Sequence, residues 1–523
     1  MIKYVVYLAS PSQSETVRRS IVSLKGQPLD DRSAIGPGWE IKHQLLPGVT
    51  LRLHLLTNIN AVTPHLRQNP VDLLIYDERG DDAEAAEVAL EQIRRDVASF
   101  AELWGPDFLF PMSRSVAILD DAKARLTQKS QTARAFQLGR VHVQDVCVAP
   151  RSTTTVLRWL YGLLTANETK NLRIGIAMSG GGLEGFLYQL GVMHALERCI
   201  SGRTIRDAEV FSGVSSGSIG CSLLAGKVPT IEVIKAMHGK SDLIEPFTSS
   251  TVFDLAGTGI IARLLRESFT WSGIDPTRWI KQTLKAIPTG FFKGEALRKY
   301  VRHCIEVSGT EDNFKSISAE LYIGGTDMDS FEHVVFGREP WNNMPISEAI
   351  YASCALPLVF EPSQINGRWF IDGQITKTCN LELVVERDCK LIFIIDPVKP
   401  LGSLVPGTLD KKGGYYALVQ TIKALVYTRF HSVLSHVTER YPDTDFIVFQ
   451  PDEEVAQMMA GSPMRYRIRT QVIQLAYKQT IRQLRERHKV YGEKLQKYGM
   501  NLATIDQIKD IEREDGALFD SFA

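Results

Sequence analysis

A serine flanked by glycines is the first feature of this sequence that could do chemistry. Ser215 lies in the pentapeptide Gly213-Val214-Ser215-Ser216-Gly217, which has the pattern Gly-x-Ser-x-Gly. The pattern favours a sharp strand-to-helix turn, because glycines tolerate strain and close approach of the backbone. A serine on such a turn is presented as a nucleophile that could attack an ester carbonyl.

A glycine triplet upstream could stabilise the negative charge that this attack would create. Gly180, Gly181 and Gly182 follow the apolar segment 174–178. Backbone N–H groups at the end of a strand are free to face an anion. We therefore expect these three glycines to form an oxyanion hole for an attack by Ser215.

An aspartate far downstream completes a recognisable order of motifs. Asp372 follows an apolar stretch and precedes Gly373. The order of glycine triplet, serine and aspartate resembles that of the patatin-like phospholipase family. The resemblance extends from about Leu172 to Pro397, with more after it, and includes the segments Gly185–Val192 and Ala352–Phe360.

This resemblance implies an activity and a mechanism. In that family a serine and an aspartate form a catalytic dyad in which no histidine takes part. The resemblance therefore implies that Ser215 is the nucleophile, that Asp372 is its general base and that the loop 180–185 holds the oxyanion. It also implies a lipid or acyl-ester substrate, as in a phospholipase A or a lysophospholipase, and neither a metal nor an organic cofactor.

Two residues depart from the family pattern. Glu184 stands where the family usually has arginine or lysine, and Gln374 stands where a second small residue usually follows Gly373. An acid at position 184 would repel an anionic headgroup, unless a nearby basic side chain pairs with it. These departures keep an alternative open, namely an interaction protein that retains the fold with weak or no turnover.

Other assignments of chemistry have less support. The loop 180–185 also fits the Gly-x-Gly-x-x-Gly fingerprint of a dinucleotide-binding oxidoreductase, but the next strand ends without the acid that holds a ribose. A histidine triad would need His431 or His436, both on an expected helix Tyr415–Val437. Asp327 is an alternative base, although an aspartate after a strand commonly fixes a loop.

Composition narrows the class of protein. The 523 residues suffice for two or three domains, and 60 Lys+Arg balance 60 Asp+Glu, so we expect no nucleic-acid partner. Seven scattered cysteines without zinc spacing suit a reducing compartment. We expect no signal peptide, because the first residues lack a charged lead and a long apolar region, and the sequence contains no apolar run as long as a membrane span. We expect a cytoplasmic protein with at most peripheral membrane contact, and the sequence does not specify its oligomeric state.

Alternating strand and helix patterns predict an α/β fold. Residues 1–150 are expected to form a smaller, doubly wound α/β domain of regulatory or other role, and 151–171 a helical connector. Residues 172–523 are expected to form a three-layer α/β/α hydrolase domain with a helical C-terminal part. The uninterrupted apolar run Leu391–Ile395 is typical of a strand covered on both faces.

Individual elements follow from the hydrophobic periodicity. The expected strands of the N-terminal domain are Lys3–Leu8, Leu51–Leu56, Val71–Tyr76, Ser115–Leu119 and Val141–Val148. Its expected helices are Glu15–Leu24, Ala83–Leu103 and Ala122–Phe136. The expected strands of the second domain are Arg173–Met178, Ala208–Phe211, Leu321–Gly324, His333–Phe336, Trp369–Ile371, Leu391–Ile395 and Phe446–Phe449.

Three further features suggest roles outside the dyad. Asp77 ends a strand as a phosphoacceptor aspartate does in receiver domains, but the first strand lacks the acidic pair for magnesium, so we expect a turn cap. The apolar stretch Leu243–Phe292 could be a packed helical insertion or an acyl-chain cleft. The basic helix Arg465–Lys497 could lie on an anionic membrane, although packing on the core is the commoner role.

Overall fold

The chain folds into two compact units. A computed structural model describes residues 2–29, 37–44, 46, 49–77, 83–104, 114–119, 143–148, 153–165, 173–248, 290–401, 410–460 and 465–522. The first unit comprises residues 1–171, 434–445 and 487–494, and the second comprises 172–433, 446–486 and 495–523.

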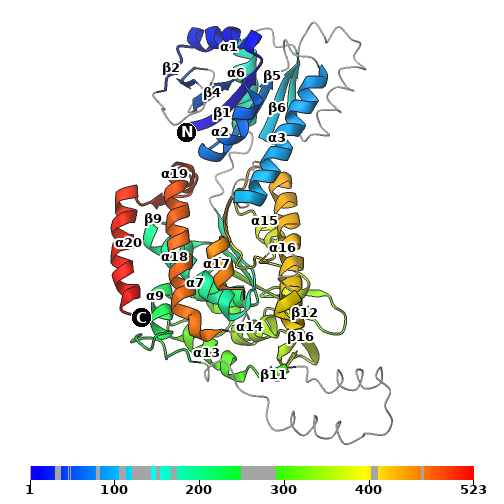
Figure 1. Ribbon diagram of the computed structural model, residues 1–523, viewed down its shortest axis with the longest axis vertical. Helices are drawn as coiled ribbons and strands as arrows, with labels where there is room; N and C mark the ends of the chain where they lie inside the picture. The colour runs from blue at the N-terminus through cyan, green and yellow to red at the C-terminus, as the bar shows by residue number, and fades with distance from the viewer. Residues whose placement is uncertain are drawn as a thin grey trace, which may run out of the picture. The chain divides into compact units, whose positions relative to one another are not determined.

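The first unit is built on a seven-stranded sheet in the order β2-β3-β4-β1-β5-β6-β7 (Figure 1). Its strands are β1 (Ile2–Ala9), β2 (Gln27–Pro28), β3 (Gly38–Ile41), β4 (Thr50–Leu56), β5 (Leu73–Asp77), β6 (Ser115–Leu119) and β7 (Val143–Val148). β4, β1, β5, β6 and β7 are parallel, whereas β2 and β3 are antiparallel additions at one edge. The parallel order corresponds to 2-1-3-4-5, a doubly wound arrangement, which confirms the predicted fold class.

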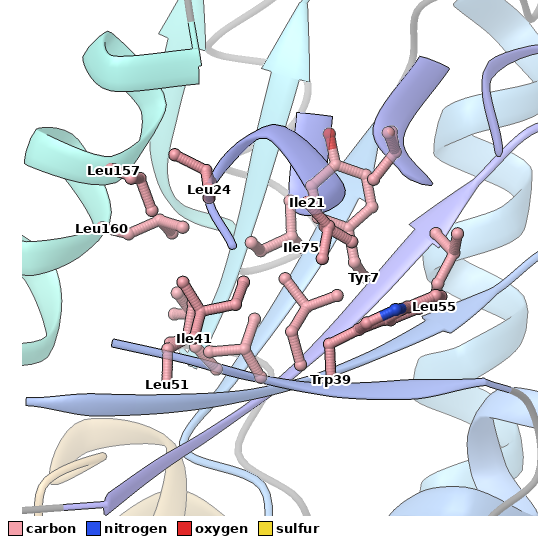
Figure 2. Close-up of a cluster of buried hydrophobic side chains, with 14 of the residues drawn as sticks. Tyr7, Ile21, Leu24, Trp39, Ile41, Leu51, Leu55, Ile75, Leu157 and Leu160 are labelled. Carbon is pink, nitrogen blue, oxygen red and sulfur yellow. The ribbon is translucent and has the colours of Figure 1, made fainter. Parts of the chain in front are cut away.

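Helices cover both faces of this sheet. They are α1 (Pro11–Ser23), α2 (Val62–Gln68), α3 (Ala83–Trp104) and α6 (Thr153–Thr165). Because neighbouring residues of a strand point to opposite faces, β1 contributes to two cores. Tyr7 belongs to one buried cluster with Ile21 of α1 and Leu157 of α6 (Figure 2), whereas Val6 belongs to a second cluster with Leu90 of α3.

The predicted strands of this unit begin and end within two residues of the observed ones. The short elements β2, β3 and α2 were not predicted, because two to seven residues give too little periodicity to recognise. The predicted helix Ala122–Phe136 lies outside the described residues. Asp77 is fully buried at the end of β5, where its carboxylate accepts a hydrogen bond from the Tyr7 hydroxyl at 2.7 Å.

The second unit is built on an eight-stranded mixed sheet. The strand order is β15-β16-β12-β10-β8-β17-β18, and β13 also pairs with β12. These strands are β8 (Ile174–Met178), β10 (Val210–Val214), β12 (Glu320–Asp327), β13 (His333–Phe336), β15 (Ser363–Ile365), β16 (Arg368–Asp372), β17 (Leu391–Ile395) and β18 (Asp445–Phe449). β12, β10, β8 and β17 are parallel, whereas β13 and β16 run antiparallel to β12. All seven strands predicted here are present.

Helices lie on both faces of the parallel strands. The helices that matter for the site are α7 (Gly182–Cys199), α8 (Ser216–Ala225), α13 (Glu295–Glu306), α14 (Ile346–Cys354), α15 (Leu381–Glu386), α16 (Gly414–Arg440) and α18 (Arg469–Glu486). Gly213 pairs with Met178, and Met178 lies three residues after Gly175 on the same strand. Because successive residues of a strand point to opposite faces, Gly175 and Gly213 face opposite sides of the sheet. A Cβ on Gly175 would meet Val384 of α15 at 2.3 Å, and one on Gly213 would meet Ser218 of α8 at 2.5 Å. The sheet is therefore covered by α15 on one face and α8 on the other.

The predicted basic helix 465–497 is two helices, α18 and α19 (His488–Gln496). α18 buries Val472, Ile473, Tyr477 and other residues. It lies against α7 so closely that a Cβ on Gly191 would come within 2.4 Å of the Ile473 carbonyl oxygen. The apolar face of α18 is therefore occupied by the protein core. Among the described helices, none is long and apolar enough to cross a membrane.

Candidate active site

Ser215 lies on the turn between β10 and α8. Its φ of 52° and ψ of −129° are unfavourable for a residue with a Cβ, and such strain is typical of functional turns. Gly217 lets α8 approach the strands, because a Cβ there would lie 2.4 Å from the Met178 carbonyl oxygen. The Ser215 N–H donates to the Ser353 hydroxyl at 2.8 Å, and this hydroxyl donates to the Gly324 carbonyl at 2.6 Å. Contacts from β8, β12 and α14 therefore hold the strained turn.

The glycine triplet connects β8 to α7 beside this turn. Gly182 has a φ of 64°, which favours glycine, and a Cβ on Gly180 would lie 2.6 Å from the Cβ of Ser215. The N–H groups of Gly180, Gly181 and Gly182 donate to no backbone carbonyl of a described residue. They are therefore available to an anion formed next to Ser215.

A buried carboxyl group anchors the glycine loop from behind. The Ser179 hydroxyl donates to Asp396, and the Gln450 side chain donates to the other carboxylate oxygen at 2.7 Å. The Gln189 side chain donates to the Ser179 carbonyl at 2.6 Å. Burial raises the pKa of Asp396 to about 6, against the opposite effect of the hydrogen bonds from Ser179 and Gln450. This network fixes the residue that precedes the glycine triplet.

Asp372 ends β16 and caps the short 3-10 helix η6 (Gly373–Ile375). Its Oδ1 accepts a hydrogen bond from the Gln374 N–H at 2.8 Å. Burial raises the pKa of Asp372 to about 6, and hydrogen bonds from the Ser215 side chain and the Gln374 N–H partly offset this increase. The structure thus brings the Asp372 carboxyl group to the Ser215 hydroxyl, although 157 positions separate the two residues in the sequence.

A largely apolar cavity of about 190 Å³ opens onto both side chains. Its apolar walls come mainly from α7, α8, α13 and α16, and include Phe186, Ile219, Leu297, Val301, Ile422 and Val426. Phe247, from the predicted apolar stretch 243–292, also lines the cavity. Residues 249–289 of that stretch lie outside the described residues. A cavity of this composition suits an acyl chain whose ester group lies near Ser215.

The alternative catalytic residues lie in other environments. Asp327 accepts the N–H groups of Asp329 and Ser330 and pairs with Arg368 at 2.7 Å. Burial raises the pKa of Asp327, but these partners hold it below its usual value, as expected for a residue that fixes a loop. Neither His431 nor His436 is among the described residues that line the cavity.

Glu184 does not present its charge to the cavity. Its side chain is 1% exposed and is absent from the described cavity lining. Arg465 donates from Nε to Glu184 Oε1 at 2.7 Å. Of the two possibilities left open for this acid, repulsion of an anionic headgroup or pairing with a basic side chain, the structure shows the pairing. The sequence could not reveal a partner 281 positions away.

Gln374, the second departure from the family pattern, reaches across to the glycine loop. A Cβ on Gly180 would lie 2.5 Å from its Oε1, and its buried Nε2 has no hydrogen-bond partner among the described residues. Arg429 of α16 donates to the Gln374 carbonyl and, at 2.9 Å, to the Ile375 carbonyl. The loop that carries Asp372 is thus fastened to α16.

Several residues of this site carried no signal in the sequence. Ser353 lies in a segment noted only for its resemblance, and Asp396 simply follows an apolar strand. Lys423 and Arg465, which approach the site from α16 and from the segment before α18, have no local pattern at all. Among the described residues, no cluster of three His, Cys, Asp or Glu side chains could hold a metal ion.

Comparison with known proteins agrees with this geometry at the level of the family. Residues 176–385 match the family model described as Patatin-like phospholipase. No curated protein sequence matches the chain. Two solved structures have low similarity to it. VipD from Legionella pneumophila has 15% identity and a TM-score of 0.29, over 67% of this chain and 74% of its own. The cytosolic domain of the T. maritima FeoB iron transporter in its GDP form has 11% identity and a TM-score of 0.22, over 58% and 98%. Scores this low support no argument about this chain.

The family match covers β10, α8, β12 and β16, so both Ser215 and Asp372 lie within it. The match of residues 176–385 confirms the resemblance and the α/β/α fold predicted from the motifs. This match supports a lipid acyl-hydrolase activity in general terms.

Proposed function

We propose that this protein is a serine hydrolase that cleaves carboxylic esters of lipids, as a phospholipase A or a lysophospholipase does. The Ser215 hydroxyl attacks the ester carbonyl while Asp372 accepts its proton. The N–H groups of Gly180, Gly181 and Gly182 stabilise the oxyanion. The tetrahedral intermediate expels the alcohol, which takes the proton from Asp372. Water, deprotonated by the same aspartate, then attacks the acyl-enzyme. The bond to Ser215 Oγ breaks, Asp372 returns the proton to Oγ, and the fatty acid leaves.

The observation that carries this proposal is the convergence of Ser215 and Asp372 on one apolar cavity. Ser215 occupies a strained turn, and strain of this kind is kept where it serves a function. Asp372 is a suitable base, because a pKa of about 6 leaves it mostly ionised at neutral pH and still basic enough to accept a proton. The apolar walls offer the acyl chain a place out of water.

Labelling with a fluorophosphonate tests the proposal, since this probe reacts with an activated serine. The expected result is one adduct, located on Ser215 by peptide mapping. Ser216 lines the same cavity and is the nearest alternative, so Ser216→Ala is a matched control that should keep the adduct while Ser215→Ala loses it. An adduct on Ser216, or none on the folded protein, would contradict the assignment.

One observation favours a second candidate, a patatin-fold protein that binds partners without turnover. Gln374 approaches Gly180 so closely that a Cβ there would lie 2.5 Å from its Oε1, which leaves little space beside the proposed oxyanion hole. This candidate would be supported if the parent protein takes no fluorophosphonate label and the Gln374→Gly variant does, because glycine would clear that space. Labelling of the parent protein at Ser215 would exclude it.

A further inference from the structure

The side chain of Gln374 reaches from the loop after Asp372 to the glycine loop. The position that a Cβ on Gly180 would occupy lies 2.5 Å from Gln374 Oε1 and 3.0 Å from Gln374 Cδ. The same position lies 2.6 Å from the Cβ of Ser215. The Gln374 amide and the Ser215 side chain therefore lie around one small volume, and both residues line the cavity.

Hydrogen bonds on both sides hold the backbone of Gln374 in place. Its N–H donates to Asp372 Oδ1 at 2.8 Å. Its carbonyl accepts a hydrogen bond from Arg429, which also donates to the Ile375 carbonyl at 2.9 Å and to the Thr378 hydroxyl at 3.0 Å. The backbone cannot move away without the loss of these hydrogen bonds, so only rotation of the side chain could make room for a larger group.

Packing for stability does not explain why the Gln374 side chain lies here. Its Nε2 is buried and has no hydrogen-bond partner among the described residues. A buried amide group that lacks an acceptor is destabilising, so its presence in a folded protein needs a separate reason. A role in the site is such a reason, because the amide lies beside the residue that we propose as the nucleophile.

The proposed mechanism places the alcohol part of the ester beside Gln374. In that mechanism the acyl chain lies against the apolar walls, and the oxyanion faces the N–H groups of the glycine loop. The leaving oxygen takes its proton from Asp372, so it must lie within hydrogen-bond distance of that carboxyl group. The Gln374 N–H donates to the same carboxyl group at 2.8 Å. The carbon that bears the leaving oxygen therefore lies next to Gln374, whose amide extends from there to Gly180.

We propose that Gln374 restricts the alcohol side of the site, so that this protein prefers esters of primary alcohols to esters of secondary alcohols. In a glycerolipid these are the esters at the end carbons and the ester at the middle carbon. This inference rests on the proposed hydrolase function, because it assigns the substrate class of the same site. A secondary alcohol has a second carbon group on the carbon that bears the leaving oxygen, and this group would meet the Gln374 amide. A primary alcohol has only hydrogen there.

Two isomeric esters test this preference. The esters n-propyl octanoate and isopropyl octanoate have the same acyl chain and differ only in whether the alcohol is primary or secondary. The ratio of their kcat/KM values, linear over branched, should fall at least about ten-fold from the parent protein to Gln374→Ala, because one carbon group in a close-fitting pocket changes kcat/KM by about 10- to 200-fold. The intrinsic reactivities of the two esters cancel in this comparison. An unchanged ratio would overturn the proposal.

Two further variants separate the bulk of Gln374 from other effects. Gln374→Met keeps nearly the same volume without the amide, and should keep the ratio within about three-fold of the parent value. Val301→Ala enlarges the cavity at its α13 wall, and should change kcat/KM for both esters alike, because they share the acyl chain. A fall in either variant as large as the fall in Gln374→Ala would overturn the proposal.

A binding measurement separates this inference from the proposed hydrolase function. If the parent protein hydrolyses neither ester, the hydrolase proposal fails, and isothermal titration calorimetry of Ser215→Ala then decides whether Gln374 excludes a branched alcohol. The linear ester should bind more tightly than the branched ester, and adding Gln374→Ala should remove most of that difference. In that case, equal binding of the two esters to Ser215→Ala would overturn the inference.

Discussion

Two buried carboxyl groups of the second unit have similar acidity and different neighbours. Burial raises the pKa of both Asp372 and Asp396 to about 6. Asp372 lies at the cavity next to Ser215, whereas Asp396 is enclosed by Ser179 and Gln450 and is not among the described lining residues. The first can therefore exchange a proton with a substrate, and the second can only position the glycine loop.

The acidity of Asp372 predicts a pH profile. Only the ionised carboxylate can accept the Ser215 proton, so kcat/KM should rise with pH through about 6 and level off above it. The profile of Asp396→Asn serves as the control. Its activity is expected to be lower, because Ser179 loses its charged acceptor, but the rise should stay near the same pH. If the rise disappears in Asp396→Asn, the titrating group is Asp396, and the assignment of the pH profile to Asp372 is wrong.

Replacement of the base gives a direct comparison of dyad and triad. Asp372→Asn should lower kcat about 100- to 10,000-fold, the usual contribution of a positioned general base. The double variant His431→Ala/His436→Ala should keep most of the activity, because neither histidine lines the described cavity. Steady-state kinetics on one short-chain ester compare the variants. A collapse in the double histidine variant, with Asp372→Asn little affected, would rule out the dyad.

The residues expected from the sequence and those missed differ in one physical respect. Ser215, Gly180 and Asp372 belong to local motifs, since their function depends on a turn or a strand end formed by neighbouring residues. Arg465 and Lys423 act across tertiary contacts, for which no local pattern exists. The sequence therefore predicted the candidate nucleophile and base, but could not predict the charge that surrounds them.

At the scale of elements, the close approach of α8 to the end of β8 determines the shape of the site. Gly217 permits it, since the Met178 carbonyl oxygen is 2.4 Å and the Ser179 carbonyl oxygen 2.7 Å from the position of a Cβ. Backbone atoms cannot move as the end of a flexible side chain can, so a methyl group there must displace α8 itself. The displacement would move Ser215 relative to the glycine loop.

Gly217→Ala should therefore lower both stability and activity. Overpacking of this kind costs about 1–3 kcal/mol, and the shift of α8 should reduce kcat more than it changes KM. Gly516→Ala is a matched control in α20 (Ile505–Asp520), where a Cβ would meet no atom within 4 Å. It should stabilise the protein by up to about 1 kcal/mol. Urea denaturation measures the stability of each variant, and kinetics on the same ester measure its activity. If Gly217→Ala and Gly516→Ala are equally stable, Gly217 is not needed for the close approach of α8.

The hydrophobic pattern predicted three strands with their observed bounds, namely Ser115–Leu119, His333–Phe336 and Leu391–Ile395. Leu391–Ile395 was predicted with its observed bounds, because a strand covered on both faces reads as a continuous apolar run. The basic segment 465–497 was expected as one helix and is two. Its break at Arg487 leaves the helical spacing of apolar residues almost intact, so periodicity alone could not reveal it.

At the scale of the whole molecule, two segments from the C-terminal part of the chain cluster with the first unit. These are residues 434–445 and 487–494. Lys489 donates to the Asn69 side chain at 3.2 Å, and Arg114 donates to the Pro442 carbonyl. Contacts between residues hundreds of positions apart give no local signal. A domain boundary predicted near residue 172 from sequence patterns therefore could not assign residues 434–445 and 487–494 to the first unit.

A shortened chain that begins at Leu172 is expected to be unstable. It would leave Lys489 without Asn69 and would remove the sheet that residues 434–445 and 487–494 cluster with. The expected result is a lower unfolding temperature than the full chain shows, together with aggregation. Thermal unfolding followed by circular dichroism measures this. If the shortened chain unfolds at the temperature of the full chain and keeps its activity, the contacts of residues 434–445 and 487–494 with the first unit contribute nothing to stability.

The proposed mechanism depends most on Ser215 as the nucleophile, and the hydrolysis of monooleoylglycerol by Ser215→Ala tests this role most directly. Alanine differs from serine by one oxygen atom, and the backbone bond from the Ser215 N–H to Ser353 is kept, so the variant should keep the far-UV circular dichroism of the parent protein. Its kcat should fall at least about 1,000-fold, as expected when a nucleophile is removed. A folded Ser215→Ala protein that retains kcat within ten-fold of the parent would contradict the proposed mechanism.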